Sequence, residues 1–331
     1  MIYLDNAAST AVHPEVVKEM LPYFDTQYGN PSSIHQFGRK AKNAVQKARK
    51  QVAVLIGAEP DEILFTSGGT ESNNTILNGI SNLTLRIPKL RHLQNHIITS
   101  SIEHEAILKP CKNLEELDVG YNLTYLPVDE YGMVDFLDVE NSLTENTIIV
   151  SVMFANNEVG TVQPIKEISK ICKKHNVLFH TDAVQAAGKI PINVKELGID
   201  ALSISSHKIN GPKGAGALFI KKGIKLNPMI LGGGQENGLR SGTENVASIV
   251  GFGKACEIAK ERLVENSSHF KKLHSSMLER ITKEISHVKL NGHTEKRIFN
   301  NIHLTFLGVN GEDLIIKLDE HGIAASTGSA C

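Results

Sequence analysis

The sequence predicts an α/β protein with a mostly parallel, doubly wound sheet, followed by a smaller α+β domain. Through about residue 245 of the 331, short β-branched runs alternate with helical patterns, as in parallel sheets whose crossovers are helices. Beyond that point a long helical stretch replaces the alternation. We therefore expect a large domain over residues 1–245 and a small domain over residues 246–331, with the first 15 or so residues packing against the small domain.

Apolar spacing and turn residues define the individual elements. Apolar residues at three-and-four spacing predict a helix over residues 35–57 that ends at Gly57. A strand over residues 62–66 follows, and a Ser-Gly-Gly turn leads into a helix that begins near Thr70. Further strands are expected over residues 96–100, 123–128, 147–155, 177–181, 202–205 and 216–220, with a helix over residues 165–175. In the small domain we expect helical residues 246–286, a strand at 301–306, a helix at 312–321 and a short strand at 323–325.

Composition excludes several classes of protein. The formal net charge is −1, with 41% hydrophobic and 21% charged residues, which gives no electrostatic reason to expect nucleic acid or an anionic membrane as a partner. The four cysteines are far apart and form no CxxC pair, so we expect neither a zinc cage nor a disulfide framework. No signal peptide or membrane-spanning apolar run is visible, so a reducing, cytoplasmic location is expected.

The motifs of several common enzyme classes are missing. The chain contains no GxxxxGK[ST], GxGxxG or HExxH sequence, which removes the main support for a phosphate-loop NTPase, a Rossmann dehydrogenase or a zinc protease. We expect no resident metal ion.

Residues 66–72, with the sequence TSGGTES, lie between a predicted strand and a predicted helix. Backbone N–H groups and hydroxyls that converge at a helix N-terminus favour an anion. The same residues also suit a Ser/Thr-capped helix after a glycine turn. Both interpretations stay open from this stretch alone.

Two charged residues follow predicted strands. Asp182 follows a strongly apolar strand, where a carboxylate would point into the crevice in which doubly wound sheets bind ligands. Lys208 follows the strand over residues 202–205, beside hydroxyls and a histidine, and could be an imine-forming amine. Taken singly, Asp182 suits a helix cap or a surface position, and Lys208 suits a surface position.

The last residues, STGSAC, place Cys331 in a run of small residues with no apolar neighbour. This context predicts an accessible thiol on a mobile loop. An anion cradle, a strand-end Asp, a strand-end Lys and an exposed Cys together fit one cofactor, pyridoxal phosphate. That cofactor needs a phosphate site, a lysine for its aldehyde and a carboxylate that keeps its ring nitrogen protonated.

At this point the sequence resembles the pyridoxal-phosphate-dependent cysteine desulfurases of iron–sulfur cluster assembly, along essentially the whole chain. The stretches that carry the resemblance are LDNAAST (4–10), GNPSSIHQFGRKA (29–41), FTSGGTESNN (65–74), EHEAIL (103–108), NNEVGTVQPI (156–165), HTDAVQAAGK (180–189), SSHKINGPKGAGAL (205–218), GGGQENGLRSGTENV (232–246) and STGSAC (326–331). The resemblance implies the aspartate-aminotransferase fold (fold type I), a homodimer with active sites at the subunit interface.

The resemblance also implies roles for individual residues. Lys208 would hold the cofactor, Asp182 would pair with its ring nitrogen and His104 would stack on its ring. The other positions implied are Gln185 and Asn157 near the ring hydroxyl, Gly69, Thr70, Ser205 and His207 at the phosphate, Thr243 reaching the phosphate from the partner subunit, and Asn30 at the substrate carboxylate.

The implied reaction converts L-cysteine to L-alanine. Lys208 would move the α-proton, His104 would serve the thiols as acid or base, and Cys331 would attack the substrate sulfur and carry it as a persulfide. The acceptor would be an iron–sulfur scaffold or a thiolation pathway, and Cys331 could transiently ligate a cluster.

Family members continue for several dozen residues beyond the position of Cys331, so we expect the small domain of this chain to be incomplete. A carboxylate at Cys331 itself would disfavour its thiolate, and the activity of this form is therefore open. Two other functions stay open: a selenocysteine lyase, and a non-catalytic binding subunit that keeps the fold. A transaminase is less suited, because it has no use for a cysteine on a mobile loop.

Overall fold

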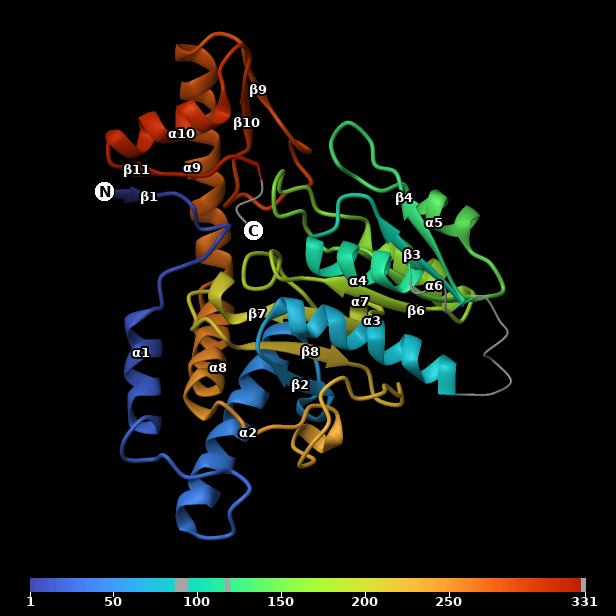
Figure 1. Ribbon diagram of the computed structural model, residues 1–331. Coiled ribbons are helices and arrows are strands. Elements are labelled where there is room, and N and C mark those ends of the chain that lie inside the picture. Colours follow the sequence, from blue (N-terminus) through green and yellow to red (C-terminus); the bar gives the residue numbers. More distant parts are fainter. Residues whose placement is uncertain (87–94, 117–119, 329–331) are drawn as a thin grey trace.

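The computed structural model describes residues 1–86, 95–116 and 120–328, and a seven-stranded sheet lies at its centre (Figure 1). The strand order is β2-β8-β7-β6-β5-β3-β4. The strands are β2 (Ile63–Thr66), β3 (Asn95–Ser100), β4 (Tyr121–Leu126), β5 (Thr147–Ser151), β6 (Leu178–Asp182), β7 (Ala201–Ser205) and β8 (Gly216–Ile220). Only β8 runs against its neighbours β2 and β7, so the predicted mostly parallel sheet is confirmed.

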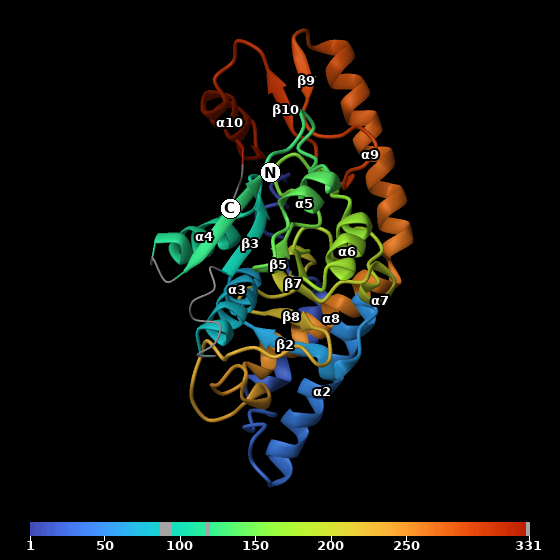
Figure 2. The same cartoon turned by 90° about the vertical axis from the view of Figure 1, so that its right-hand side faces the viewer.

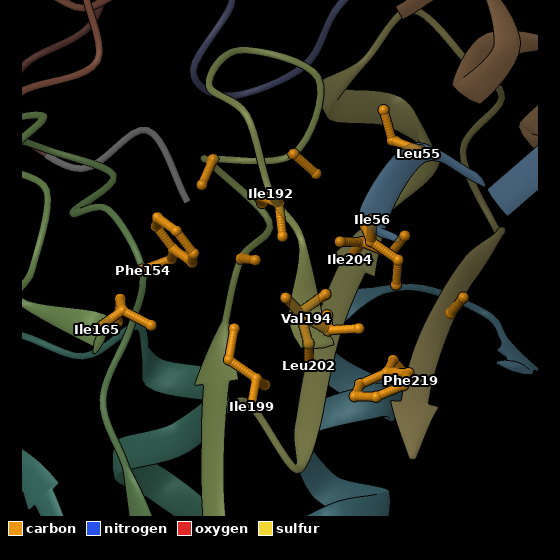
Figure 3. Packing of buried hydrophobic residues seen from close by; sticks show 14 of the residues in the cluster. Leu55, Ile56, Phe154, Ile165, Ile192, Val194, Ile199, Leu202, Ile204 and Phe219 are labelled. Carbon is orange, nitrogen blue, oxygen red and sulfur yellow. The ribbon is translucent and has the colours of Figure 1, made fainter. Parts of the chain in front are cut away.

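Helices cover both faces of this sheet (Figure 2). One face carries α3 (Gly69–Arg86) and α4 (Glu105–Glu116), and the other carries α2 (Gln36–Ile56), α6 (Ile165–Lys174), α7 (Val194–Leu197) and α8 (Val246–Glu261). Two hydrophobic clusters match these faces. The smaller one joins α3 and α4 to the sheet through Leu77, Ile97 and Ile107. The larger one, on the α2 side, contains Ile56, Leu202 and Phe219 (Figure 3).

Helix α2 shows how the sequence pattern produces the larger cluster. Its buried residues include Ala41, Val45 and Val52, which recur at helical spacing. The His35 ring caps the N-terminus by accepting from the Gly38 N–H, and Gly57 ends the helix in the left-handed region at φ 73°. A residue without Cβ adopts this conformation at little cost. The helix predicted over residues 35–57 is therefore confirmed.

Four further helices complete the described part of the fold. They are α1 (Pro14–Met20), α5 (Phe136–Ser142), α9 (Leu263–Glu284) and α10 (Gly311–Glu320). Val16 of α1 and Val139 of α5 belong to the larger cluster. Strand β1 (Ile2–Tyr3) pairs in parallel with β11 (Ile323–Ala324), and β9 (Val288–Leu290) pairs with β10 (Leu304–Phe306) in antiparallel fashion. The N-terminal residues thus lie beside a strand from the other end of the sequence (Figure 1).

Several details differ from the sequence-based expectation, and three of them have a clear reason. The single helical stretch over residues 246–286 is two helices, because Arg262 at φ −95° and ψ 5° interrupts it. Apolar periodicity runs on both sides of Arg262 and so does not reveal the break. Strand β5 ends at Ser151 rather than near residue 155, and an isolated antiparallel bridge between Ala155 and Val162 follows it. The strand β9 was not expected. It has only three residues and is only partly buried, so it leaves little alternation of apolar and polar residues to detect.

The division into a large and a small domain at residue 245 stays a prediction. The contacts of α8 bear on how the regions before and after this residue meet. Helix α8 packs against α1 and α2 of the preceding region. In the described residues, no helix is both long enough and apolar enough to cross a membrane.

Candidate active site

A cavity of about 270 Å³ opens at the carboxyl edge of the central sheet. It is lined by Gly69, Thr70, Asn73, His104, Ala106, Met153, Ala155, Asn157, Asp182, Val184, Gln185, Ser205, His207 and Lys208. These residues follow or end the parallel strands β2, β3, β5, β6 and β7. From β3 the chain pairs outward to β4, whereas β5, β6 and β7 extend the other way. The cavity therefore lies where ligands bind in doubly wound sheets, at the point where strand order reverses.

Lys208 provides the amine of this cavity. It ends a short 3₁₀ turn, Ser206–Lys208, that follows β7 directly, and only 5% of its surface is exposed. Its Nζ donates to the carbonyl oxygens of Ala7 and Ala8, the latter at 3.0 Å. A buried lysine held by backbone carbonyls beside a cavity is a positioned amine, and the surface alternative for Lys208 is wrong.

Asp182 provides the carboxylate on the neighbouring strand. It is the last residue of β6 and is 6% exposed. Its Oδ2 accepts from Asn73 Nδ2 at 2.6 Å, and its Oδ1 accepts from the Val184 N–H at 2.9 Å. Burial raises the pKa of Asp182, and these two hydrogen bonds with the charges of His104 and Lys208 oppose that rise. The carboxylate is thus held in place at the floor of the cavity.

The start of α3 forms the end of the cavity that suits an anion. Gly69 and Thr70 begin this 18-residue helix, and Ser205 and His207 face them from the Lys208 loop. A Cβ added to Gly69 would lie 2.7 Å from Val184 Cγ2. The glycine therefore keeps this approach open.

The TSGGTES stretch contributes both to the turn before α3 and to the lining of the cavity. Thr66 and Ser72 have their hydroxyls 2.8 Å apart inside the fold, and Ser72 also bonds the Gly68 carbonyl. These two side chains therefore serve the turn, whereas Gly69 and Thr70 line the cavity.

The charge around this end of the cavity is positive. Burial lowers the pKa of His207 to about 4, and the nearby charges of Lys208, Lys213 and Lys189 contribute. His207 is therefore neutral at physiological pH, and its Nδ1 lies 3.3 Å from Ser9 Oγ. Positive charge beside His207 favours an anionic group at this end of the cavity.

His104 precedes α4 on the opposite wall. Its Nδ1 accepts from the Ala106 N–H at 3.0 Å, so the neutral ring carries its proton on Nε2. Asn157 reaches the cavity from the turn after β5. Asn156 shapes that turn by accepting the N–H groups of Glu158 and Val159, both at 2.9 Å.

Glu103 is a feature of this region that the sequence did not indicate. Its Oε1 accepts from Ser100 Oγ at 2.6 Å and from the Met153 N–H at 2.7 Å, whereas Oε2 has no hydrogen-bond partner among the described residues. Burial raises the pKa of Glu103 to about 8, so the group is protonated at neutral pH. A Glu in the polar sequence EHE gives no sign of this burial.

Two predicted site residues lie apart from the cavity, and a third cannot be placed. Asn30 and Thr243 are exposed and do not line it in this single chain. Cys331 lies outside the described residues. The loop that carries Thr243 is nevertheless anchored, because Arg240 bonds Glu71 of α3 at 2.9 Å and Glu236 forms a buried ion pair with Arg49 of α2.

The cavity residues fit pyridoxal phosphate. Lys208 supplies an amine, Asp182 an acceptor for a ring N–H, and the start of α3 an anion site. Met153, Ala155 and Val184 add apolar surface for a flat ring. Asn73 Oδ1 is buried in the wall with no hydrogen-bond partner in the described part of the chain, as expected of a site that a polar ligand completes.

Comparisons with known families and proteins agree with this geometry. The family model described as Aminotransferase class-V matches residues 2–331. The chain is 50% identical over 330 residues to a protein named cysteine desulfurase IscS from Dictyoglomus turgidum, covering all of this chain and 82% of that protein. A protein of the same name from Methanosarcina thermophila is also 50% identical, over all of this chain and 80% of that protein.

Solved structures give the same result. A NifS-like protein superposes with a TM-score of 0.93 at 41% identity, over 99% of this chain and 88% of that one. A NifS-like protein from Rickettsia africae gives a TM-score of 0.88 at 37% identity, over 100% and 88% of the two chains. The structure described as SspA in complex with cysteine gives 0.86 at 36% identity, over 100% and 90%.

Proposed function

This chain belongs to the aminotransferase class-V family, and we propose that it acts within it as a cysteine desulfurase that converts L-cysteine to L-alanine and passes on the sulfur. Relatives that are 50% identical along the whole chain bear that name, and enzymes of this kind depend on pyridoxal phosphate. The observation that carries the proposal is the meeting of Lys208 and Asp182 in one cavity, at the ends of adjacent parallel strands.

Each residue of the cavity has a task in this reaction. When bound here, pyridoxal phosphate supplies an aldehyde for the substrate amine and an acceptor for the electrons released at the substrate α-carbon. Asp182 keeps a proton on the ring nitrogen by accepting it as a hydrogen bond. Lys208 would hold the cofactor aldehyde, and its Nζ lies in the cavity, where it would move the α-proton. His104 would serve the thiols as acid or base.

The sulfur leaves by attack of a second thiol. We assign this role to Cys331, whose thiolate attacks the substrate sulfur. The new S–S bond forms as the substrate C–S bond breaks, and the electrons of the C–S bond pass to the carbon skeleton. Protonation of the carbon that carried the sulfur gives alanine, and Cys331 keeps the sulfur as a persulfide. The solved relative described as a complex with cysteine supports a small amino thiol as the substrate.

The exposed residues Asn30 and Thr243 complete the proposal. In a homodimer, Thr243 on its anchored loop would reach the phosphate of the partner's cofactor, and Asn30 would contact the substrate carboxylate. The sulfur would pass to an iron–sulfur scaffold or a thiolation acceptor in the cytoplasm. Both side chains are exposed in the single chain, so they are accessible to a partner subunit or a substrate.

The direct test measures alanine from L-cysteine and from L-selenocysteine, with Cys331→Ser alongside. We expect alanine from L-cysteine with the native chain and a strong loss with the variant. A selenocysteine lyase would release alanine from selenocysteine in preference and would tolerate the variant. Failure to bind pyridoxal phosphate at all would contradict the enzyme and favour a non-catalytic binding subunit.

A further inference from the structure

Lys189 is a second lysine beside the active site, and it has no role in the reaction described above. It lies at the end of the tight turn that follows Asp182, where its N–H donates to the Ala186 carbonyl at 3.0 Å. Gly188 makes the turn possible because it adopts φ 71°. A Cβ added to Gly188 would lie only 3.0 Å from Ile209 Cγ2. The turn brings Lys189 back beneath Gln185, which lines the cavity.

The Gln185 amide is held from both ends. Lys189 Nζ donates to Gln185 Oε1 at 2.8 Å, and Gln185 Nε2 donates to the Ala7 carbonyl at 3.0 Å. In its protonated form the Lys189 amine only donates, and a carbonyl only accepts. If the amide flipped, its NH₂ would face the Lys189 ammonium and its oxygen would face the Ala7 carbonyl. Both contacts would be repulsive, so the two neighbours fix one orientation.

We propose that Lys189 is a positioning residue that holds the Gln185 amide with its NH₂ group available to the ring oxygen of bound pyridoxal phosphate. The inference rests on the proposed function, because it assumes that this cofactor occupies the cavity. The Ala7 carbonyl accepts one proton of Nε2, and the second proton is left to donate toward a ligand. A hydrogen bond donated to a phenolate oxygen stabilises its negative charge and reduces its attraction for a nearby imine proton.

The surroundings of Lys189 show that its placement costs free energy. Burial, together with the positive charge of Lys208, lowers the pKa of Lys189 to about 7. His207 is coupled to the same two amines and is itself neutral. A lysine needed only for solubility would point to water, as Lys195 does in its exposed ion pair with Glu59.

The test is a pH titration of the visible absorption of the protein loaded with pyridoxal phosphate, for the native chain and Lys189→Met. Loss of the Gln185 donor should raise the midpoint of the absorption change by about one pH unit. It should also weaken cofactor binding to the apoprotein by about tenfold, the size of one hydrogen bond to a charged group. Lys195→Met is the matched control, and its titration should match that of the native chain.

The same titration in a Gln185→Met background separates positioning from a direct field effect. If Lys189 acts through Gln185, Lys189→Met adds no further shift there. A shift of equal size in both backgrounds would overturn the proposal, as would a Lys189→Met titration identical to the native one. Lys189→Gln is the second variant should the Met variant not fold. Its shorter side chain can present oxygen as readily as nitrogen, so a smaller shift in the same direction is expected, and no shift would contradict the inference.

Failure of the cofactor binding that the proposed function requires has a different result. In that case the native chain itself would show no visible band with pyridoxal phosphate, and there would be no midpoint to compare. Binding with a normal band but no effect of Lys189 would leave the function standing and remove only the role of Lys189.

Discussion

The site has an interior half and a peripheral half, and they are built differently. The interior residues Lys208, Asp182 and Gln185 follow or end buried strands, and hydrogen bonds within the chain hold all three. The peripheral residues Asn30 and Thr243 are exposed on loops and do not line the cavity. The interior half is therefore assembled within one chain, whereas the proposed function gives the peripheral half its role only through a partner subunit or a substrate.

The largest expected effect belongs to the interior amine. Lys208→Ala removes both the group that binds the cofactor aldehyde and the base that moves the α-proton, so alanine formation should fall by about 10³-fold or more. Turnover of L-cysteine at saturating cofactor measures this. The exposed Lys195→Ala provides the control and should keep native turnover. Turnover within tenfold of native in Lys208→Ala would refute the assignment.

The interior carboxylate comes next. Asp182→Asn keeps the shape of the side chain but loses the charge that favours a protonated ring nitrogen, so kcat should fall by about 10²-fold. In the native chain Asn73 Nδ2 donates to Asp182 Oδ2. The amide introduced at residue 182 can instead turn its NH₂ group toward Asn73. Bound cofactor should remain detectable by absorbance, and an unchanged kcat would show that the ring nitrogen has another partner.

Glu103 tests the interior half through stability. Its pKa is raised by burial to about 8, so the folded state binds the proton more tightly than the unfolded state does. The stabilisation is fully present below the unfolded pKa near 4.5 and is lost as pH rises toward 8. Glu103→Gln keeps the acceptor for Ser100 and Met153 but does not ionise. It should remove a pH-dependent loss on the order of a few kcal/mol between these limits.

Chemical unfolding at several pH values measures this prediction. The native chain should lose free energy of unfolding as pH rises from 5 to about 8 relative to Glu103→Gln. Parallel curves for the two proteins would mean that Glu103 is ionised in the folded state.

The smallest expected signal is a partial recovery of activity in mixed dimers, and it tests the peripheral half. If Thr243 reaches the phosphate of the partner's cofactor as proposed, Thr243→Asp places a negative charge against it, so this variant and Lys208→Ala should each be inactive alone. Mixed dimers contain one site with native Lys208 and native Thr243, and random pairing should restore about a quarter of native activity. No recovery, with exchange of subunits verified by mass, would show that Thr243 does not act across an interface.

The sequence predicts the interior residues of the site more fully than the buried residues around them. Asp182 and Lys208 are recognisable because each follows a strand in a chain whose alternation predicts a parallel sheet. Glu103 and Lys189 are not recognisable, because their burial arises from segments far apart in the sequence: Met153 contacts Glu103, and Ala7 completes the network of Lys189. The break at Arg262 is missed for a related reason, since a backbone dihedral at one residue leaves apolar periodicity unchanged on either side.

The contact between the N-terminal segment and the Lys208 loop is another feature that only the fold reveals. Thr10 donates to the His207 carbonyl at 2.9 Å through both its N–H and its hydroxyl. These residues are 197 positions apart, and no periodicity links them. The motif LDNAAST is visible in the sequence, but its task of holding the Lys208 loop is not.

The most direct single measurement is the intact mass of the protein after borohydride reduction, with and without earlier exposure to L-cysteine. Reduction should fix one cofactor-sized increment, which peptide mapping should place on Lys208, and exposure to cysteine should add one sulfur at Cys331. Both increments together are the result that a pyridoxal-phosphate-dependent cysteine desulfurase predicts. A chain that gains neither increment would contradict it.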